Sequence, residues 1–303
     1  YSYVKEALLR GKSVCTSNKE LVARHGAELL EIARQKKVNF LFEASVGGGI
    51  PIIRPLNNSL TADKIREITG ILNGTTNYML TKMSQEHMDY DEVLKEAQAM
   101  GYAESDPTAD VGGLDAARKA VILASIAFNT RVSLDDVQIE GIQNIGIQDI
   151  EYAEKLGYVI KLLAITKNDP VNGISICVRP TMLPKAHPLA SVNDVFNAIF
   201  VTGDALGEAM FMGRGAGRYP TASAVCGDII DAARNLIHNE GNRVNCTCFE
   251  EKHMCSIENM CAPCYIRMEV NDQPGALAAI AAAFGAQSVS LHSVVQSRAA
   301  NGS

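Results

Sequence analysis

The chain has 303 residues, and its 28 Lys and Arg against 34 Asp and Glu give a formal charge of −6. This acidic balance argues against a protein that binds nucleic acid or anionic membranes, which would need clustered basic residues. Hydrophobic residues make up 47% and charged residues 20% of the chain, which excludes wholesale disorder. The length predicts about two domains. No uncharged apolar run reaches the roughly 18 residues of a membrane helix, and the start is not a signal segment, so we expect a soluble, cytoplasmic protein.

The first part of the chain alternates between helix and strand patterns. Residues 3–10 predict a helix and residues 12–16 a short strand. Residues 18–36 spread apolar positions among charges, as an amphipathic helix does, and Asn18 can cap its start. Residues 38–42 then predict a buried strand. Such alternation indicates an α/β fold. Because the chain opens inside this pattern, and stops soon after a predicted strand, we expect sequence to be missing at both ends.

A different pattern begins near residue 55, where strands joined by local turns mix with helices. The predicted helices cover residues 75–83, 91–100 and 114–128 and a segment from Pro220 to about residue 237, and the predicted strands cover residues 65–72, 158–167 and 173–179. Asn168-Asp169-Pro170 between the last two strands is a turn signal typical of a hairpin. Local strand pairing of this kind indicates an α+β domain, not continued parallel winding.

A polar, cysteine-rich stretch over residues 240–261 predicts a linker. Five of the eight cysteines gather there and just beyond, namely Cys246, Cys248, Cys255, Cys261 and Cys264. Zinc or an iron–sulfur cluster is conceivable, but the spacing matches no zinc pattern well, so an ordinary linker is favoured. Residues 264–270, 276–284 and 290–296 then predict a strand, a helix and a strand. One such β-α-β unit is too small to bury a core alone.

The segment 101–115 is the most informative, because it places carboxylates in a Gly/Pro-rich loop and in the helix after it. Asp115 and Lys119 are four residues apart on that helix and so lie on one face. As an exposed pair they would contribute little. The helix is apolar nearly all round from Ala120 onward, so we expect it to be internal and the pair to lie at the mouth of a site. A desolvated lysine can exchange protons near neutral pH, which suits acid–base catalysis.

Two glycine-rich stretches and one lysine are further candidates. Residues 43–51 follow a strand and contain three consecutive glycines, and residues 213–217 precede the helix at Pro220. Such loops allow close ligand approach and their carbonyls can bind a cation, although a tight connection alone is an equally good interpretation. Neither fits the G-x-G-x-x-G fingerprint of dinucleotide-binding folds. Lys19 stands at a strand-to-helix junction, where α/β folds bind ligands, but such a lysine is more often a plain surface residue.

Together these segments resemble homoserine dehydrogenases. The resembling stretches are residues 16–19, 43–52, 70–78, 101–107, 113–119 and 215–221, and they follow one another in the family's order. Residues 271–277 and 289–291 resemble the start of an ACT domain, the small regulatory module of many bacterial members.

The resemblance implies both a fold class and a domain division. The fold would combine α/β and α+β parts. The implied parts are a partial Rossmann-like nucleotide-binding domain at 1–54, an α+β catalytic and dimerisation domain at 55–218, a helix at 219–239 that packs back on the nucleotide-binding domain, the linker at 240–261 and a partial ACT (βαβ) module at 262–303.

The resemblance also implies the interconversion of L-homoserine and L-aspartate 4-semialdehyde with NADP or NAD, a branch step toward threonine, methionine and isoleucine. In the family's pattern Lys119 would be the proton donor and acceptor, Asp115 and Glu104 would bind homoserine, Lys19 would lie by the nicotinamide and the substrate, and Gly101 and Gly217 would lie near the cofactor. The backbone carbonyls of Glu43, Val46, Gly48 and Ile50 would hold a sodium ion. Family members are usually homodimers or larger, and threonine is a possible ligand of the ACT module.

Two features keep other hypotheses open. The family's opening strand and glycine fingerprint, and the latter part of the ACT module, have no counterpart in this sequence. One alternative is therefore a non-catalytic homologue that binds an amino acid or dimerises. A weaker alternative is the dehydrogenase half of a bifunctional aspartokinase, against which the C-terminal position of the ACT-like segment argues.

Overall fold

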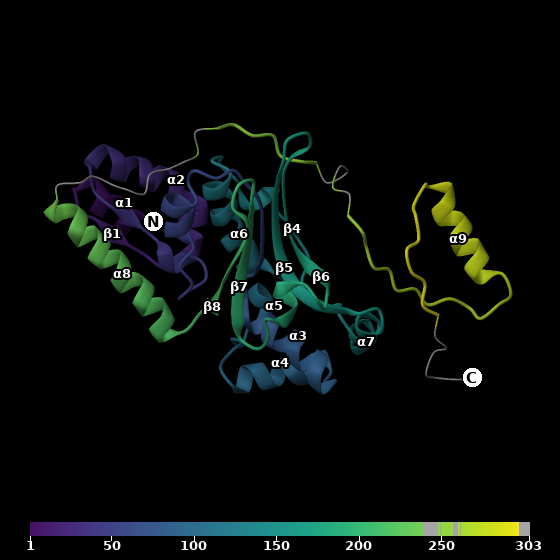
Figure 1. Cartoon of the computed structure of the whole chain (residues 1–303). Coiled ribbons are helices and arrows are strands. Elements are labelled where there is room, and N and C mark those ends of the chain that lie inside the picture. The colour runs from purple at the N-terminus through teal and green to yellow at the C-terminus, as the bar shows by residue number, and fades with distance from the viewer. Residues whose placement is uncertain (239–247, 249, 257–259, 261, 297–303) are drawn as a thin grey trace. The chain divides into compact units, whose positions relative to one another are not determined.

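The computed structural model describes residues 1–238, 248, 250–256, 260 and 262–296 (Figure 1). The chain divides into two compact units, Tyr1–Cys261 and Ala262–Ser303. No helix within the described ranges is long and apolar enough to span a lipid bilayer.

The larger unit begins with a small α/β layer, as the alternating pattern predicts. The elements are α1 (Ser2–Leu9), β1 (Val14–Cys15), α2 (Lys19–Lys36) and β2 (Phe40–Leu41), and the two short strands pair in parallel. The Asn18 side chain accepts a hydrogen bond from the Leu21 N–H at 3.0 Å, so it caps α2. The long helix α8 (Arg218–Ile237) contacts β1 (Figure 1).

A six-stranded sheet forms the centre of this unit, in the order β4-β6-β5-β3-β7-β8. The strands are β3 (Ile65–Ile71), β4 (Gln138–Ile139), β5 (Tyr158–Asp169), β6 (Gly173–Pro184), β7 (Phe196–Gly203) and β8 (Gly207–Arg214), and all neighbours are antiparallel except β4 and β6. The three strands predicted in this region and the β5–β6 hairpin are confirmed. The β7–β8 hairpin was not predicted, although the run Phe196 to Val201 is rich in the aromatic and β-branched residues that favour strands.

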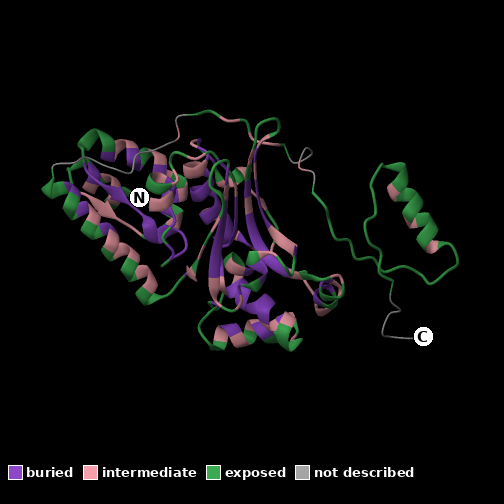
Figure 2. Cartoon of the chain, in the orientation of Figure 1, coloured by how far each residue is buried: buried purple, intermediate pink, exposed green. Residues whose placement is uncertain are grey.

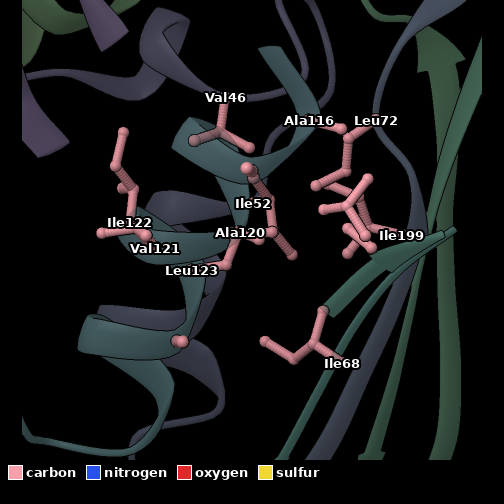
Figure 3. Packing of buried hydrophobic residues seen from close by; sticks show 14 of the residues in the cluster. Val46, Ile52, Ile68, Leu72, Ala116, Ala120, Val121, Ile122, Leu123 and Ile199 are labelled. Carbon is pink, nitrogen blue, oxygen red and sulfur yellow. The ribbon is translucent and has the colours of Figure 1, made fainter. Parts of the chain in front are cut away.

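Helices cover one face of the sheet. The helices α3 (Gly74–Glu86), α6 (Leu114–Ala127) and α7 (Ile147–Lys155) contact its strands. The helix α4 (Tyr90–Ala99) packs on α3, and the short helix α5 (Thr108–Val111) packs on α3 and α6. Helix α6 contacts β3, β5 and β6 on one side and α2 on the other. Figure 3 shows Val121 and Ile122 on one side of α6, with Ile68 and Ile199 of the strands on the other. A helix packed between a sheet and a second helix has no solvent face, which explains why its sequence is apolar nearly all round.

The opposite face of the sheet carries a second, smaller apolar cluster. Because successive side chains of a strand point to opposite faces, Ile71, Leu163 and Phe200 lie away from the helices. The turn at Pro188–Ser191 packs on them through Leu189. In Figure 2 the central strands are coloured mostly as buried, so the core of the larger unit lies on both faces of this sheet.

Part of the cysteine-rich stretch is attached to the larger unit. The His253 carbonyl accepts a hydrogen bond from the Ile174 N–H at 2.8 Å, and Lys252 Nζ donates to the Phe128 carbonyl at the end of α6 at 2.7 Å. Among the described residues, no group of three or more His, Cys, Asp or Glu side chains is arranged to hold a metal ion. Cys246 and Cys261 lie outside the described residues.

The smaller unit contains the predicted helix, α9 (Ala276–Ala286), but not the predicted strands. Residues 264–270 and 290–296 are not strands in the described part of this unit, so that prediction was wrong. No residue of α9 is buried. A strand needs a hydrogen-bonded neighbour and an apolar face needs a partner, and one β-α-β segment supplies too little of both. The ACT module is therefore not established by this fold.

Candidate active site

The first two turns of α6 carry a buried acid and a buried lysine. Asp115 is 5% exposed and Lys119 is 7% exposed. The helix begins after Gly113, whose φ of 84° glycine adopts without strain. Lys119 Nζ lies 2.7 Å from Asp115 Oδ2 and donates a second hydrogen bond to the Leu72 carbonyl at 2.6 Å. The predicted burial of this pair is confirmed.

Lys19 reaches the same carboxylate from a different part of the fold. It is the first residue of α2, and its Nζ lies 2.6 Å from Asp115 Oδ1. Its side chain is 40% exposed, so it forms the solvent side of the cluster while Lys119 forms the buried side. Asp115 therefore lies between two ammonium groups, one on each of its oxygens.

This geometry controls the charge of the acids. Burial alone would raise the pKa of Asp115, but the ammonium groups of Lys119 and Lys19 outweigh it and hold that pKa below its ordinary range. The nearby Asp110 differs, because burial and the negative charge of Asp115 keep its pKa above its ordinary value. Two neighbouring acids with pKa values displaced in opposite directions are typical of a catalytic site.

Asn73 belongs to this cluster, and we did not predict it from the sequence. It follows β3 and caps α3, where its Oδ1 accepts a hydrogen bond from the Thr76 N–H at 2.9 Å. Its Nδ2 donates to Asp115 Oδ2 at 2.9 Å and to Asp110 Oδ1 at 2.7 Å. The available sequence signal was an Asn-Gly pair directly after a buried strand, which we used only to place the start of a helix.

Glu104 does not join the others. It lies in the exposed loop after α4, and its carboxylate makes no hydrogen bond or ion pair with any residue in the described part of the chain. The loop is held through its backbone, since Gln98 Nε2 donates to the Glu104 carbonyl at 3.1 Å. Gly101, in the same loop, has a φ of 75° and open space where a Cβ would point. Of the side chains to which the resemblance assigns substrate chemistry, Asp115 and Lys119 therefore lie together and Glu104 faces solvent.

The two glycine-rich loops meet each other. The Gly49 N–H donates to the Arg214 carbonyl at 3.1 Å, and a Cβ at Gly48 would lie 2.5 Å from the Gly215 carbonyl oxygen. Gly217 has a φ of 117° and precedes α8. Close packing between the loops thus accounts for Gly48, whereas a Cβ at Gly217 would make only ordinary van der Waals contact with Pro220.

Glu43 is buried and serves to shape the first of these loops. Its carboxylate accepts hydrogen bonds from the backbone N–H groups of Ile52, Ile53 and Arg54 at 2.6–2.9 Å. Its own N–H donates to Asp228 of α8 at 3.0 Å, and Arg54 pairs with the same aspartate at 2.6 Å. Burial raises the pKa of Glu43, against the effect of the N–H donors. The carboxylate is therefore fully engaged within the protein.

Comparison with known proteins identifies the family. The family model described as homoserine dehydrogenase matches residues 51–230. Homoserine dehydrogenase from Synechocystis sp. is 47% identical over 306 residues, covering 97% of this chain and 70% of the relative. The enzyme from Corynebacterium glutamicum is 49% identical, covering 97% of this chain and 66% of the relative.

Solved structures agree with this. A homoserine dehydrogenase from Thiobacillus denitrificans superposes with a TM-score of 0.85 at 38% identity, covering 97% of this chain and 69% of that one. A hyperthermophilic archaeal homoserine dehydrogenase in complex with NADPH superposes with a TM-score of 0.68 at 33% identity, covering 77% and 68% of the two chains. The mixed α/β fold matches these structures and the sequence matches these relatives, so the chain belongs to the homoserine dehydrogenase family of NAD(P)-dependent oxidoreductases.

Proposed function

We propose that Lys119 and Asp115 form the proton-transfer pair in the family's reaction, the interconversion of L-homoserine and L-aspartate 4-semialdehyde. The observation that carries this proposal is the buried contact of 2.7 Å between Lys119 Nζ and Asp115 Oδ2. Apart from Asp115, Lys119 donates only to the Leu72 carbonyl among the described residues. The Lys119 amine is thus held in one position by one carboxylate and one carbonyl, and it has no ion pair with a second acid among the described residues.

Alcohol oxidation requires a base beside the substrate hydroxyl. NADP or NAD, when bound, supplies the chemistry of the redox step by accepting hydride from the carbinol carbon. For oxidation the Lys119 ammonium first gives a proton to solvent. As the hydride leaves, the hydroxyl proton passes to the neutral amine of Lys119, and the ammonium formed again is stabilised by the Asp115 carboxylate. In the reverse direction the Lys119 ammonium returns the proton to the aldehyde oxygen. Lys19, on the other oxygen of Asp115, keeps that carboxylate ionised and oriented.

Substrate recognition is proposed to use a second acid. The amino group of homoserine is cationic, so an acid open to solvent and without a protein partner suits it. Glu104 has both properties. We assign it to the substrate ammonium, together with Asp115.

The cofactor is proposed to lie against Gly101 and Gly217. A Cβ at Gly101 would meet nothing within 4 Å, and at Gly217 the nearest atom is Pro220 Cδ at 3.5 Å. The open space beside Gly101 therefore supports this proposal, whereas a Cβ at Gly217 would be in ordinary contact with Pro220 and one at Gly48 would overlap Gly215. The NADPH complex of the archaeal relative agrees with a dinucleotide in this family.

A sodium ion is proposed for the loop that follows Glu43. The carbonyls of Val46, Gly48 and Ile50 accept no hydrogen bond from any described residue, and hard cations prefer oxygen ligands. Because the Glu43 carboxylate is already engaged by three N–H groups, this residue would contribute through its backbone carbonyl. Exchanging sodium for choline chloride in the assay would test the proposal through both activity and thermal stability.

Regulation and assembly remain predictions. We propose that residues 262–303 form part of an ACT module that binds threonine and that the chain forms a homodimer. The support is the apolar surface of the smaller unit, where Ile266, Met268 and Val270 alternate and are all about half exposed. Calorimetry with threonine and analytical ultracentrifugation would test the two predictions separately.

The assignment of Lys119 can be tested by one substitution with a matched control. We expect Lys119→Met to lower kcat for NADPH formation from L-homoserine by about 10²–10⁴-fold, the usual contribution of general acid–base catalysis. Lys82→Met removes another lysine of a helical i,i+4 pair, with Glu86, and should leave kcat unchanged. A folded protein without homoserine-dependent turnover would refute the function, and an active Lys119→Met variant would refute the role of Lys119.

A further inference from the structure

The Asn73 side chain uses all its hydrogen-bonding capacity inside the site. It is 5% exposed. Its Nδ2 donates to Asp110 Oδ1 at 2.7 Å and to Asp115 Oδ2 at 2.9 Å, and its Oδ1 accepts from the Thr76 N–H at 2.9 Å and from Thr76 Oγ1 at 3.0 Å. A side-chain amide offers two N–H donors and two acceptor positions, so none remains free.

This arrangement fixes the amide in one orientation. Turning it over would bring its oxygen against the carboxylates of Asp110 and Asp115 and its N–H groups against the Thr76 N–H. Each of these contacts would be repulsive. The Asn73 side chain therefore both caps α3 and donates to the two acids, and as one rigid group it joins the segment after β3 to the start of α6.

Asn73 also determines how Asp115 faces its lysines. Asp115 Oδ2 accepts from both Asn73 Nδ2 and Lys119 Nζ, while Oδ1 faces Lys19. Hydrogen bonds to an ionised group are stronger than those between neutral groups, so losing this one would leave the carboxylate held by the two lysines alone and freer to rotate. Without the amide, Asp110 and Asp115 would also repel each other with no donor between them.

We propose that Asn73 is a positioning residue whose NH₂ group holds the carboxylates of Asp110 and Asp115 apart, so that Asp115 Oδ2 stays directed at Lys119. The inference rests on the proposed role of Lys119 and Asp115. It adds a group that does not touch the reacting atoms but sets the geometry of one that does.

Two substitutions separate this role from helix capping. Serine and aspartate both cap helices well, so Asn73→Ser and Asn73→Asp keep an acceptor for the Thr76 N–H. Asn73→Ser removes the NH₂ group without adding charge, and Asn73→Asp replaces it with a third carboxylate. We expect each to lower kcat by about 10- to 100-fold, the worth of a hydrogen bond to a charged group, while the KM for NADP is unchanged. Asn172→Asp, which adds the same charge in the exposed β5–β6 turn, should leave kcat at the wild-type value.

The pH dependence provides a readout that a purely structural role would not move. The charged groups that act on Asp110 are Asp115 and Lys119 of α6 and Lys19 of α2. The Asn73 hydrogen bond lowers the pKa of Asp110, against burial and the charge of Asp115. In Asn73→Ser that pKa should rise, and ¹³C NMR of the aspartate carboxyl carbons measures it without an activity assay. The acidic limb of the kcat profile should move to higher pH in the same variant.

The outcomes distinguish this inference from the proposed function. If the wild type is inactive but the Asp110 signal still shifts in Asn73→Ser, the proposed dehydrogenase function is refuted, while the hydrogen bonds from Asn73 to Asp110 and Asp115 are supported. An active wild type with no shift and unchanged kcat in Asn73→Ser would overturn the role of Asn73. Thermal unfolding shows whether Asn73→Ser is folded. If it is not, Asn73→Asp tests the role of Asn73 by the same measurements, because aspartate has the same shape as asparagine.

Discussion

Lys19 Nζ lies 2.6 Å from Asp115 Oδ1, and this contact joins the first turn of α2 to the first turn of α6. The other oxygen of Asp115 binds Lys119 from within α6 itself. One carboxylate thus connects the small α/β layer to the helices on the central sheet. The proposed active site is therefore sensitive to how these two parts pack on each other.

Removing Lys19 should weaken the fold in a pH-dependent way. The lowered pKa of Asp115 contributes stability above the pKa of an unfolded aspartate, about 3.9, which is lost as the pH falls through the folded value. In Lys19→Met that pKa rises, so the free energy of unfolding at pH 7 should fall by about 1 kcal/mol, because solvent screens a lysine that is 40% exposed. The gap from the wild type should be the same at pH 5 and at pH 7, and it should narrow only where the pH falls through the lowered folded pKa values of Asp115, below the pKa of an unfolded aspartate.

Lys5→Met is the matched control for this prediction. Lys5 pairs with Glu28 at 2.7 Å, and both side chains are well exposed. Surface pairs of this kind contribute little, so this variant should unfold like the wild type at every pH. Urea unfolding at pH 3, 5 and 7 measures both effects. Equal stability of Lys19→Met and the wild type at pH 7 would contradict the prediction.

The sequence predicts the part of this site that lies within one helix. Asp115 and Lys119 are recognisable because their spacing and the apolar residues after them are local properties of α6. The contact of Lys19 with Asp115, and the bridge made by Asn73, depend on how α2, α3 and α6 pack, which no local pattern contains. The predicted strands in residues 262–296 fail for a related reason, since alternation favours a strand only where a neighbour is present to pair with it.

Glu104→Gln should affect substrate binding more than turnover. If Glu104 pairs with the substrate ammonium, its loss should raise the KM for L-homoserine by about tenfold, with a smaller change in kcat, since uniform binding is lost. Thermal stability should be unchanged because the side chain is exposed. Asp106→Asn, in the same loop, is the control and should keep the wild-type KM. An unchanged KM in Glu104→Gln would remove this residue from the substrate site.

The contact between the glycine loops predicts a difference between two alanine substitutions. Gly48 and Gly11 both have positive φ, 53° and 73°, so alanine is strained at each by about 1–2 kcal/mol. A Cβ at Gly48 would also lie 2.5 Å from the Gly215 carbonyl oxygen, whereas one at Gly11 would meet nothing within 4 Å. Gly48→Ala should therefore cost about 1–3 kcal/mol more than Gly11→Ala in denaturant unfolding. Equal losses would show that the loops move apart easily.

A buried lysine outside the proposed site should make stability rise with pH, as Asp115 does, but in the alkaline range. Lys161 of β5 is 3% exposed and donates to the Val192 carbonyl at 2.6 Å and to Asn77 Oδ1 and Asn193 Oδ1, each at 3.1 Å. It has no ion pair with a described residue. Burial lowers the pKa of Lys161 to about 8, although the charge of Asp194 opposes this.

The sign follows from which state binds the proton. Between pH 8 and about 10.4, the unfolded chain keeps the Lys161 proton and the folded chain loses it, so stability from this group rises with pH. In Lys161→Met this rise is absent. The difference in free energy of unfolding between wild type and variant should therefore shift in favour of the wild type by up to about 3 kcal/mol from pH 7 to pH 10. Lys167→Met, at an exposed position of the same strand, should show no such shift. Urea unfolding at both pH values provides the measurement, and parallel pH dependence of wild type and Lys161→Met would show that Lys161 remains protonated throughout.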